Sequence, residues 1–270
     1  MTDEPPDALK ARVARRYGLL ASTWDRIGPR IFALAGQKLV ELSEVAPGDR
    51  VLDVGMGRGA VLFAAAERAG PSGRIIGIDI SEEMVALTAR EIEERGLANA
   101  EVYAMDAESL DLPDGWFDCV LCGAALFFFP HVVQALAQFH RVLRPGGRFG
   151  ATTFGRNDER WGWWPALRQQ FGVEPRYAVR HFEDPAEVPA VLAQAGFVNI
   201  RVSESEFELV YADEEEWWAS QHVDLEGVLD SDTLARLQAA AFGQVRALKG
   251  PDGIHRWAGI RCYLAGKPML

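Results

Sequence analysis

The segment Arg50–Gly59, RVLDVGMGRG, joins an apolar run to an acidic residue and then to three glycines at alternate positions. The apolar run is typical of a buried parallel strand, and the glycines allow a tight turn that leaves room for a ligand near a helix start. The glycines are Gly55, Gly57 and Gly59, and the acidic residue is Asp53. The segment indicates a site for a nucleotide-like ligand, and by itself it fits more than one class of cofactor.

Two further acidic residues follow later apolar runs, where we expect strands to end. Asp79 closes the run 74–80, twenty residues after the last glycine of the loop, and Asp106 follows the run 101–105. Because ligands of open parallel sheets bind outside the carboxyl ends of the strands, both acids and Asp53 should converge on one crevice. A carboxylate such as Asp79 accepts hydrogen bonds from both ribose hydroxyls, which suits NAD and S-adenosylmethionine (SAM) alike.

The position of Asp53 favours one of these cofactors. A fixed negative charge before the loop would repel a pyrophosphate, whereas it can pair with the ammonium or offset the sulfonium of SAM. Asp106 is placed to accept the exocyclic amine of adenine, with Met105 and Ala107 covering the ring. GMGRGA also satisfies the dinucleotide spacing if Ala60 stands for the third glycine, so an NAD oxidoreductase remains an alternative.

Alternating strands and helices must position these residues. Strand-like runs lie at 51–54, 74–80, 101–105, 116–122, 148–153, 197–204, 207–211 and 253–264. Helical segments lie at 60–69, 81–95, 132–143 and 185–196; Ser81 caps the second, and 144–147 is a turn. We predict an α/β fold, a Rossmann-like doubly wound and mainly parallel seven-stranded sheet with helical cap additions.

We expect a single domain over residues 1–270, since this length and 49% hydrophobic residues suffice for a full core. Residues 1–45 are predicted to form an N-terminal helical cap segment and residues 46–154 the cofactor-binding core. Residues 155–184 and 212–250 are predicted to be insertions that cap the substrate.

Composition argues against several classes of partner. The formal net charge of −11 disfavours nucleic acid, and the polar N-terminus and the absence of a long apolar run predict a cytoplasmic protein without a membrane span. Cys119 and Cys122 are three residues apart in a strand-like run, so they point to opposite faces and cannot easily share a metal ion. We expect small buried cysteines and no metal site.

Five segments, in order, resemble the motifs of class I SAM-dependent methyltransferases: VLDVGMGRG, the acid in GIDI, AMDAESL, FDCVLCGAAL and RVLRPGG. The subgroup resembled is the small-molecule methyltransferases of ubiquinone and menaquinone biosynthesis. YGLLASTWD adds to this likeness, with Trp24 in place of the usual tyrosine before Asp25. The resemblance implies SAM as cofactor, S-adenosylhomocysteine as product, and methylation of a small metabolite at carbon, oxygen or nitrogen, in secondary or quinone-like metabolism.

The resemblance also implies a set of cofactor contacts. The three glycines and Asp53 would lie near the methionine part, and Asp79 would hold the ribose. The remaining contacts are Ile80 and Met84 beside the adenine, Asp106 and Ala107 at its amine edge, Cys122 in the wall from the fourth strand, and Tyr17 over the methionine carboxylate. Ordinary core packing is the alternative for Ile80, Met84 and Cys122.

A catalytic base is needed only for some methyl acceptors, because the transfer is an in-line displacement. His222 and Glu226 are four residues apart, on one face if the segment is helical, and we predict them as the catalytic pair. A solvated helical face is the alternative for this pair. His131 fits a helix cap as well as a site role, and His140 is expected to be structural.

Aromatic and basic residues near the predicted insertions bear on the acceptor. The aromatic residues are Phe127, Phe128, Phe129, Trp161, Trp163, Trp164, Trp217 and Trp218, and the arginines are Arg156, Arg160, Arg168, Arg176 and Arg180. They suit an apolar or planar acceptor and an anionic group on it, with core packing and surface ion pairs as alternatives. An alternative function is a SAM-binding protein of the same fold that catalyses another reaction, such as a cyclisation, or serves as a noncatalytic partner.

Overall fold

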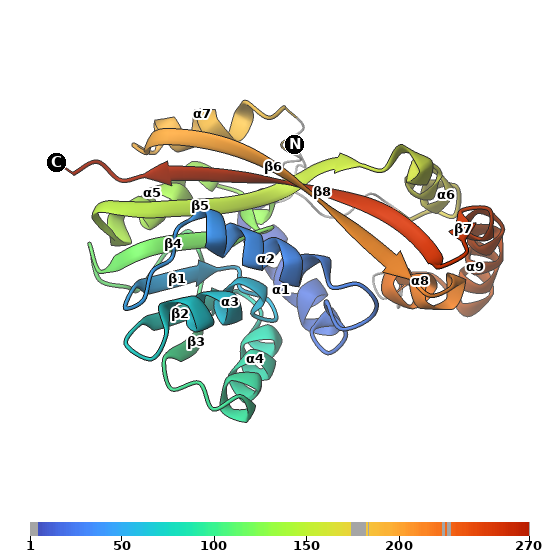
Figure 1. Ribbon diagram of the computed structural model, residues 1–270, viewed down its shortest axis with the longest axis horizontal. Helices are drawn as coiled ribbons and strands as arrows, with labels where there is room; N and C mark the ends of the chain where they lie inside the picture. The colour runs from blue at the N-terminus through green and yellow to red at the C-terminus, as the bar shows by residue number, and fades with distance from the viewer. Residues whose placement is uncertain (1–4, 174–181, 183, 223–224, 226–227, 270) are drawn as a thin grey trace.

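The computed structural model describes residues 5–173, 182, 184–222, 225 and 228–269 (Figure 1). Strands alternate with helices through the first part of the chain, as predicted. The strands are β1 (Arg50–Val54), β2 (Arg74–Asp79), β3 (Ala100–Ala104), β4 (Phe117–Gly123) and β5 (Leu143–Asn157). The helices among them are α3 (Ala60–Ala69), α4 (Glu82–Glu94), the short η1 (Leu126–Phe128) and α5 (Val132–Val142). Ser81 caps α4 by accepting a hydrogen bond from the Met84 amide at 3.2 Å.

The later part of the chain adds two long strands, β6 (Val198–Tyr211) and β8 (Gly253–Gly266). Its other elements are η2 (Glu159–Trp161), α6 (Trp163–Gln170), α7 (Glu187–Gln194), α8 (Glu214–Gln221), α9 (Ser231–Arg246) and β7 (Lys249–Gly250). Two predictions are wrong here. Residues 144–147, expected to form a turn, lie within β5, and the two strand-like runs at 197–204 and 207–211 form the single strand β6. The second difference arises because β8 pairs with β6 without a break from Arg201 to Tyr211.

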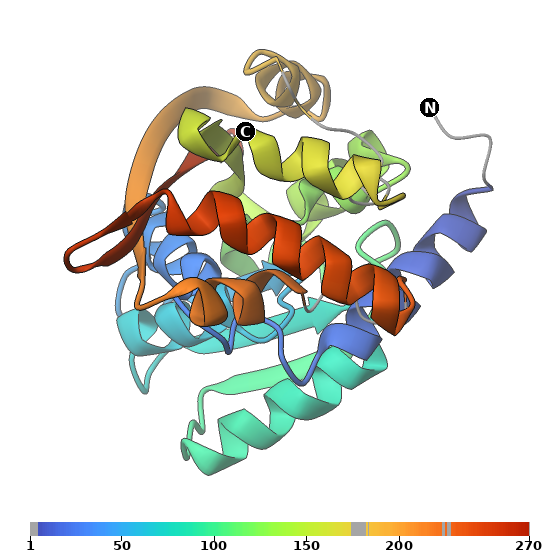
Figure 2. The ribbon, with the colours of Figure 1, turned by 90° about the vertical axis from the view of Figure 1, so that its right-hand side faces the viewer.

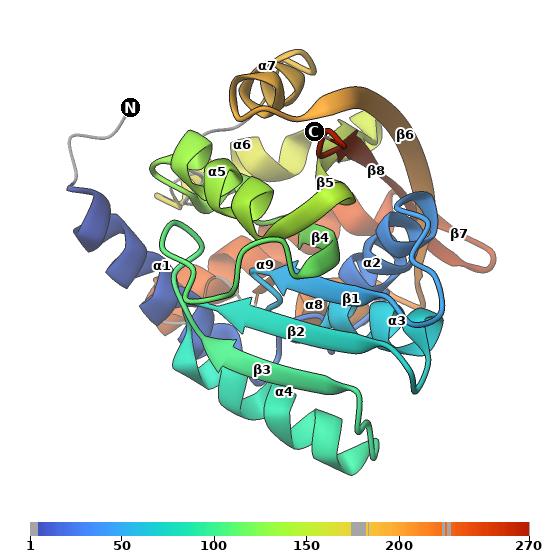
Figure 3. The same ribbon diagram turned by 90° about the vertical axis from the view of Figure 1, so that its left-hand side faces the viewer.

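Within the described residues, these strands form one sheet, in which a path of seven runs β3-β2-β1-β4-β5-β8-β6 and β7 pairs with β8. The first five strands of this path are parallel to one another, and β8 is antiparallel to both β5 and β6. The predicted mainly parallel, Rossmann-like α/β fold is confirmed. Strand order reverses at β1, which has β2 on one side and β4 on the other, and such a switch point opens a ligand crevice at the carboxyl ends of the strands (Figure 3).

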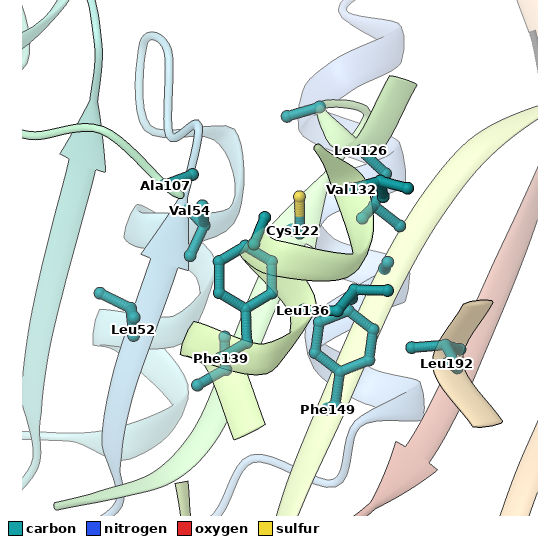
Figure 4. Packing of buried hydrophobic residues seen from close by; sticks show 14 of the residues in the cluster. Leu52, Val54, Ala107, Cys122, Leu126, Val132, Leu136, Phe139, Phe149 and Leu192 are labelled. Atoms are coloured by element: carbon teal, nitrogen blue, oxygen red, sulfur yellow. The ribbon is translucent and has the colours of Figure 1, made fainter. Parts of the chain in front are cut away.

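Apolar clusters cover both faces of the parallel part of the sheet. Cys122 lies in a cluster with Phe139 of α5 and Phe149 of β5 (Figure 4). Cys119 lies in a second cluster with Leu62 of α3 and Leu39 of α2 (Ile31–Leu42). The two cysteines therefore face opposite sides of the sheet, as their spacing predicts, and this arrangement prevents them from sharing a metal ion.

Strands β5, β6 and β8 continue past the parallel core toward α6, α8 and α9 (Figure 1). Helix α9 contacts both α6 and α8, and the three helices cover this end of the molecule (Figure 2). A third apolar cluster joins Trp164 of α6, Trp217 of α8, Phe242 of α9 and Leu209 of β6. No helix in the described residues is long and apolar enough to cross a membrane. The division into a core and caps at the expected boundaries stays a prediction.

Candidate cofactor and acceptor site

A cavity of about 940 Å³ lies at the carboxyl ends of the central strands and continues along the inner face of the extended strands. Its volume falls within the range of small-molecule sites. Eight of the predicted cofactor contacts line it: Tyr17, Gly55, Gly57, Asp79, Ile80, Met84, Asp106 and Ala107. Gly59, Asp53 and Cys122 are not among its lining residues. Cys122 is fully buried in the apolar cluster described above, which matches the packing alternative for this residue.

Gly57 lies at the centre of the loop between β1 and α3. Its φ of +53° is in the left-handed region, and a Cβ atom placed there would meet no other atom within 4 Å. The Gly57 amide donates a hydrogen bond to Asp79 Oδ2 at 2.9 Å, and the Gly57 carbonyl accepts one from Thr88 Oγ1 at 2.9 Å. The loop is thus held between β2 and α4 with its backbone beside the cavity.

Asp79 ends β2 at the cavity wall. In addition to the Gly57 bond, its Oδ1 accepts a hydrogen bond from the Ser81 amide at 2.9 Å. The two backbone bonds fix the plane of the carboxylate and leave a lone pair on each oxygen for a ribose hydroxyl. Burial raises the pKa of Asp79. This geometry fits the predicted ribose contact.

Asp53 is fully buried, and neither carboxylate oxygen has a hydrogen-bond partner among the described residues. It lines a small cavity of about 30 Å³ whose wall shares Gly55, Ala60 and Gly123 with the large cavity. Burial raises the pKa of Asp53 to about 8. The Leu62 amide in the first turn of α3 acts to lower this pKa, whereas the nearby Asp79 carboxylate adds to the increase. A buried carboxylate without a partner fits the ammonium group of SAM, which supplies both a positive charge and hydrogen-bond donors.

Asp106 is tied to the N-terminal helix α1 (Pro6–Leu20). Its Oδ2 pairs with Lys10 Nζ at 2.7 Å, and its Oδ1 accepts the Glu108 amide at 2.9 Å. Lys10 also pairs with Glu108 Oε2 at 2.5 Å, and Glu108 is only 2% exposed. Sequence analysis missed Lys10 and Glu108, because no local pattern signals a contact between residues almost one hundred positions apart.

His131 belongs to the same group. It is the N-cap residue of α5, its backbone amide donates to Glu108 Oε1 at 2.7 Å, and its Nδ1 lies 3.1 Å from Glu108 Oε2. His131 is not among the residues that line the cavity. The structure therefore places it at a helix cap, one of the two roles that the sequence allowed.

Helix α1 lies beside the carboxyl ends of β1 and β2 (Figure 3). Tyr17 on this helix makes edge-to-face contacts with Trp24 at 5.0 Å and with Phe128 at 5.1 Å between ring centroids. All three rings line the cavity. They join the N-terminal segment to η1 across the site, in a position to shield bound groups from water.

Arg58 connects the glycine loop to the N-terminal segment. Its Nη1 donates to the Ala21 carbonyl at 2.7 Å, and its Nη2 pairs with Glu91 Oε2 at 3.1 Å. Glu91, on α4, also forms ion pairs with Arg26 and Arg95. This cluster, which sequence analysis also missed, links three separate segments around the cofactor end of the cavity.

The other end of the cavity is bounded by the extended strands and α6. The lining residues there include Phe154, Asn157, Trp164, Arg168, Leu209, Tyr211, Arg256, Ala258 and Ile260. Of the aromatic residues singled out in the sequence, Phe127, Phe128, Phe129 and Trp164 line the cavity. Trp161, Trp163, Trp217 and Trp218 instead contact one another in the third apolar cluster.

Of the predicted catalytic pair, the structure describes only His222. The His222 ring stacks on Trp218 at 5.9 Å, its Nδ1 lies 3.0 Å from the Trp218 carbonyl, and it is not a lining residue. Helix α8 ends at Gln221, and Glu226 lies outside the described residues. The catalytic role of His222 and Glu226 stays a prediction. His140 packs edge-on against Phe197 at 5.2 Å, in keeping with a structural role.

The arginines singled out in the sequence have separate environments. Arg160 pairs with Asp158 at 2.6 Å, Arg156 is exposed, and Arg168 is buried at the cavity. Arg176 and Arg180 lie outside the described residues. The structure adds Arg256, from β8, to the cavity wall.

Residues 51–147 match a methyltransferase domain family. Nocamycin O-methyltransferase of Saccharothrix syringae is 37% identical over 209 residues, which cover 72% of this chain and 75% of that protein. Aklanonic acid methyltransferase of a Streptomyces species is 42% identical over 53% of this chain and 66% of its own length. A ubiquinone/menaquinone biosynthesis C-methyltransferase of Pseudomonas entomophila is 34% identical over 53% of this chain and 56% of its own length.

Solved structures show the same fold. The [4+2]-cyclase SpnF superimposes with a TM-score of 0.61 and 22% identity, and the match covers 96% of each chain. Phosphoethanolamine N-methyltransferase 2 of Haemonchus contortus, solved with SAM, has a TM-score of 0.61 and 19% identity over 96% of this chain and 60% of that one.

The sheet, the glycine loop, the strand-end carboxylates and these relatives define the class of protein. The chain belongs to the class I SAM-dependent methyltransferases and is of the small-molecule type, as the sequence motifs indicated. Its cofactor is SAM, and the product formed from the cofactor is S-adenosylhomocysteine.

Proposed function

We propose that this protein transfers the methyl group of SAM to a small, apolar and largely planar metabolite. The observation that carries the proposal is that one cavity reaches from the glycine loop to an aromatic wall. Gly57 and Asp79 line its cofactor end, whereas Trp164, Phe154 and Tyr211 line the end bounded by the extended strands. Such a cavity would accommodate a cofactor and an acceptor at once, in contact with each other.

The residues at the cofactor end would each bind one part of SAM, which supplies an electrophilic methyl group when bound. Asp79 would hold the ribose, and Asp106 would bind the amine edge of the adenine. Asp53 would bind the ammonium group where the small cavity adjoins the large one. Tyr17 and its neighbouring rings would exclude water and restrict the acceptor to one orientation. Alignment and water exclusion are the main contributions that a protein makes to an in-line displacement.

We propose oxygen as the methylated atom. The nocamycin enzyme, which matches the chain over most of its length, is named an O-methyltransferase. No histidine occurs among the described residues that line the cavity. An acceptor whose hydroxyl group is already acidic fits such a site, because it is ionised without help from a base. The metabolism would be secondary metabolism, and the supporting observation is that two of the relatives named above are an aklanonic acid methyltransferase and a nocamycin O-methyltransferase.

The test is an assay with SAM and a panel of planar acceptors that carry acidic hydroxyl groups. Release of S-adenosylhomocysteine together with a methylated product is the expected result. Acceptors methylated at nitrogen or carbon alone would contradict the assignment of oxygen. Tight SAM binding without turnover across the panel would favour a reaction of another kind, such as a cyclisation, for which the likeness to the SpnF fold is the supporting observation.

A further inference from the structure

Phe154 of β5 is largely uncovered by the protein, although it lines the cavity. It is 47% exposed, and among the exposed large apolar side chains of the described residues it is the one that lines the cavity. Phe127 and Trp164 line the same cavity and are only 5% and 6% exposed. Since an apolar ring that stays in water costs free energy, an open phenyl ring inside a cavity is suited to be covered by a bound apolar molecule.

The strand register places Phe154 just beyond the cofactor end of the cavity. Thr152 of β5 pairs with Gly123, the last residue of β4, and Thr152 Oγ1 accepts a hydrogen bond from the Ala124 amide at 2.9 Å. Thr152 also lines the small cavity beside Asp53. Phe154 lies two residues further along β5, roughly 7 Å at about 3.3 Å per residue, and its side chain leaves the strand on the same face as that of Thr152. Phe154 is therefore the next side chain outward from the residues that would hold the methionine part of SAM.

Phe154 belongs to a closed circuit of six aromatic rings, in which each ring contacts the next and all six line the cavity. In order, the members are Tyr17, Trp24, Phe32, Phe154, Phe127 and Phe128. Their neighbouring centroids lie between 4.6 and 6.4 Å apart, which is the usual range for attractive ring pairs. Phe154 is exposed, whereas the other five are buried or half-buried. The circuit thus leaves the Phe154 ring as the open part of an aromatic lining.

The surroundings of Phe154 favour an unsaturated ring over a saturated one. Its ring lies 5.5 Å from the ring of Phe127 and 6.4 Å from that of Phe32, and Ile260, its partner in β8, also lines the cavity. Aromatic rings attract one another in offset-stacked or edge-to-face pairs, and this attraction is added to the burial of apolar area. A flat ring that covers Phe154 would gain this attraction, and a saturated ring of the same size would not.

We propose that Phe154 is a specificity-determining residue, whose exposed ring stacks against the ring that carries the methylated hydroxyl group. The acceptors are then phenols or enols on flat, unsaturated rings, and alcohols on saturated rings are disfavoured. This inference rests on the proposed function for the reaction and for the methylated atom. It adds the chemical class of the hydroxyl group. The stacking contact orients the acceptor beside the cofactor and takes no part in proton transfer.

Two alcohols with the same carbon skeleton test the contact in the full-length protein saturated with S-adenosylhomocysteine. 2-Naphthol is flat and aromatic, whereas decahydro-2-naphthol is saturated and puckered, and calorimetry measures the dissociation constant of each. Phe154→Leu keeps an apolar side chain but removes the ring. We expect it to weaken binding of 2-naphthol by about three- to tenfold and binding of the saturated alcohol by less than about twofold.

Two further variants serve as controls. Phe154→Tyr keeps the ring and should retain the affinity for 2-naphthol within about twofold. Phe171→Leu is the matched substitution, because Phe171 is half-buried at the end of α6 and does not line the cavity. It should change the binding of neither alcohol.

Equal weakening of both alcohols in Phe154→Leu would show that Phe154 only fills space, and would overturn the inference. Unchanged binding of 2-naphthol in that variant would overturn it too, as would failure of the unaltered protein to bind 2-naphthol. Weaker binding of S-adenosylhomocysteine in Phe154→Leu would assign the ring to the cofactor instead of the acceptor.

The proposed function and the role of Phe154 can fail separately. Turnover of the acceptor panel by Phe154→Leu with an unaltered preference for flat acceptors would leave methyl transfer standing and overturn the role of Phe154. A preference for 2-naphthol that depends on Phe154, found without turnover of any acceptor, would support the stacking contact and count against methyl transfer.

Discussion

The Asp79 carboxylate at the end of β2 accepts a hydrogen bond from the amide of Gly57, the central glycine of the loop after β1, at 2.9 Å. One side chain thus connects the loop that would approach the methionine part of SAM to the strand end that would hold the ribose. The same carboxylate that would bind the cofactor therefore also holds the glycine loop in place.

Asp79→Ala should weaken SAM binding by about a hundredfold or more, because two charge-assisted hydrogen bonds to the ribose and the support of the loop are lost together. Asp79→Asn, which keeps one acceptor oxygen, should have a smaller effect. Calorimetry measures the SAM affinity of both variants, and thermal unfolding checks that each variant is folded. An unchanged affinity in the alanine variant would refute the ribose assignment.

Asp53→Asn should make the ligand-free protein more stable at neutral and alkaline pH. The pKa of Asp53 is raised in the folded state to about 8 from the ordinary value of 3.8. A neutral Asp53 therefore favours folding at low pH, and this contribution is lost as the pH rises through about 8. Asparagine stays neutral at every pH. The melting temperature of the variant minus that of the unaltered protein should therefore increase from about pH 5 to about pH 9. A constant difference would contradict the raised pKa.

The same substitution should weaken SAM binding, since the ammonium group needs an ionised partner. In the unaltered protein, SAM affinity should rise with pH and level off above about 8, the pKa of Asp53, and in Asp53→Asn this rise should be smaller. Titrations of both proteins with SAM over this pH range give the comparison. Parallel pH profiles would show that Asp53 does not meet the ammonium group.

Lys10→Met should loosen α1 from the cofactor end of the cavity. The substitution keeps the length of the side chain but leaves the buried Glu108 without its cationic partner, which should cost about 1–3 kcal/mol in the free energy of unfolding. Urea denaturation measures this cost. Lys38→Met is the control, since Lys38 pairs with the exposed Glu41 and should contribute less than about 1 kcal/mol. Equal effects of the two substitutions would contradict the special role of Lys10.

His222→Ala tests whether His222 contributes to the stability of the fold or to catalysis. Because the His222 ring stacks on Trp218, we expect a loss of about 1 kcal/mol of stability with unchanged SAM affinity. Turnover with an acceptor identified in the panel should be largely kept. Abolished turnover in a variant of normal stability and SAM affinity would instead support the predicted role of His222 as a base.

The cofactor half of the site was predictable because its signals are local. A positive φ favours glycine, as at Gly57, and each acid sits at the end of an apolar run, so the strand order of the fold brings Asp53 and Asp79 to one edge. The acceptor half was not predictable to the same degree. Strand β6 was expected as two runs, and Arg256 was not singled out, since the inward face of an extended strand is defined by its partners in the sheet.

The sequence alone determined the α/β class and the SAM cofactor, and eight of the cofactor contacts that it predicted line the cavity, because periodicity, glycine positions and strand-end acids are properties of short segments. The tertiary structure decided which side chains share a space. It placed Lys10 on Asp106 and Glu108, packed His222 against Trp218, and brought Arg256 and Arg168 to the wall of the cavity remote from the glycine loop. These relationships depend on contacts between residues far apart in the chain, and such contacts leave no local pattern in the sequence.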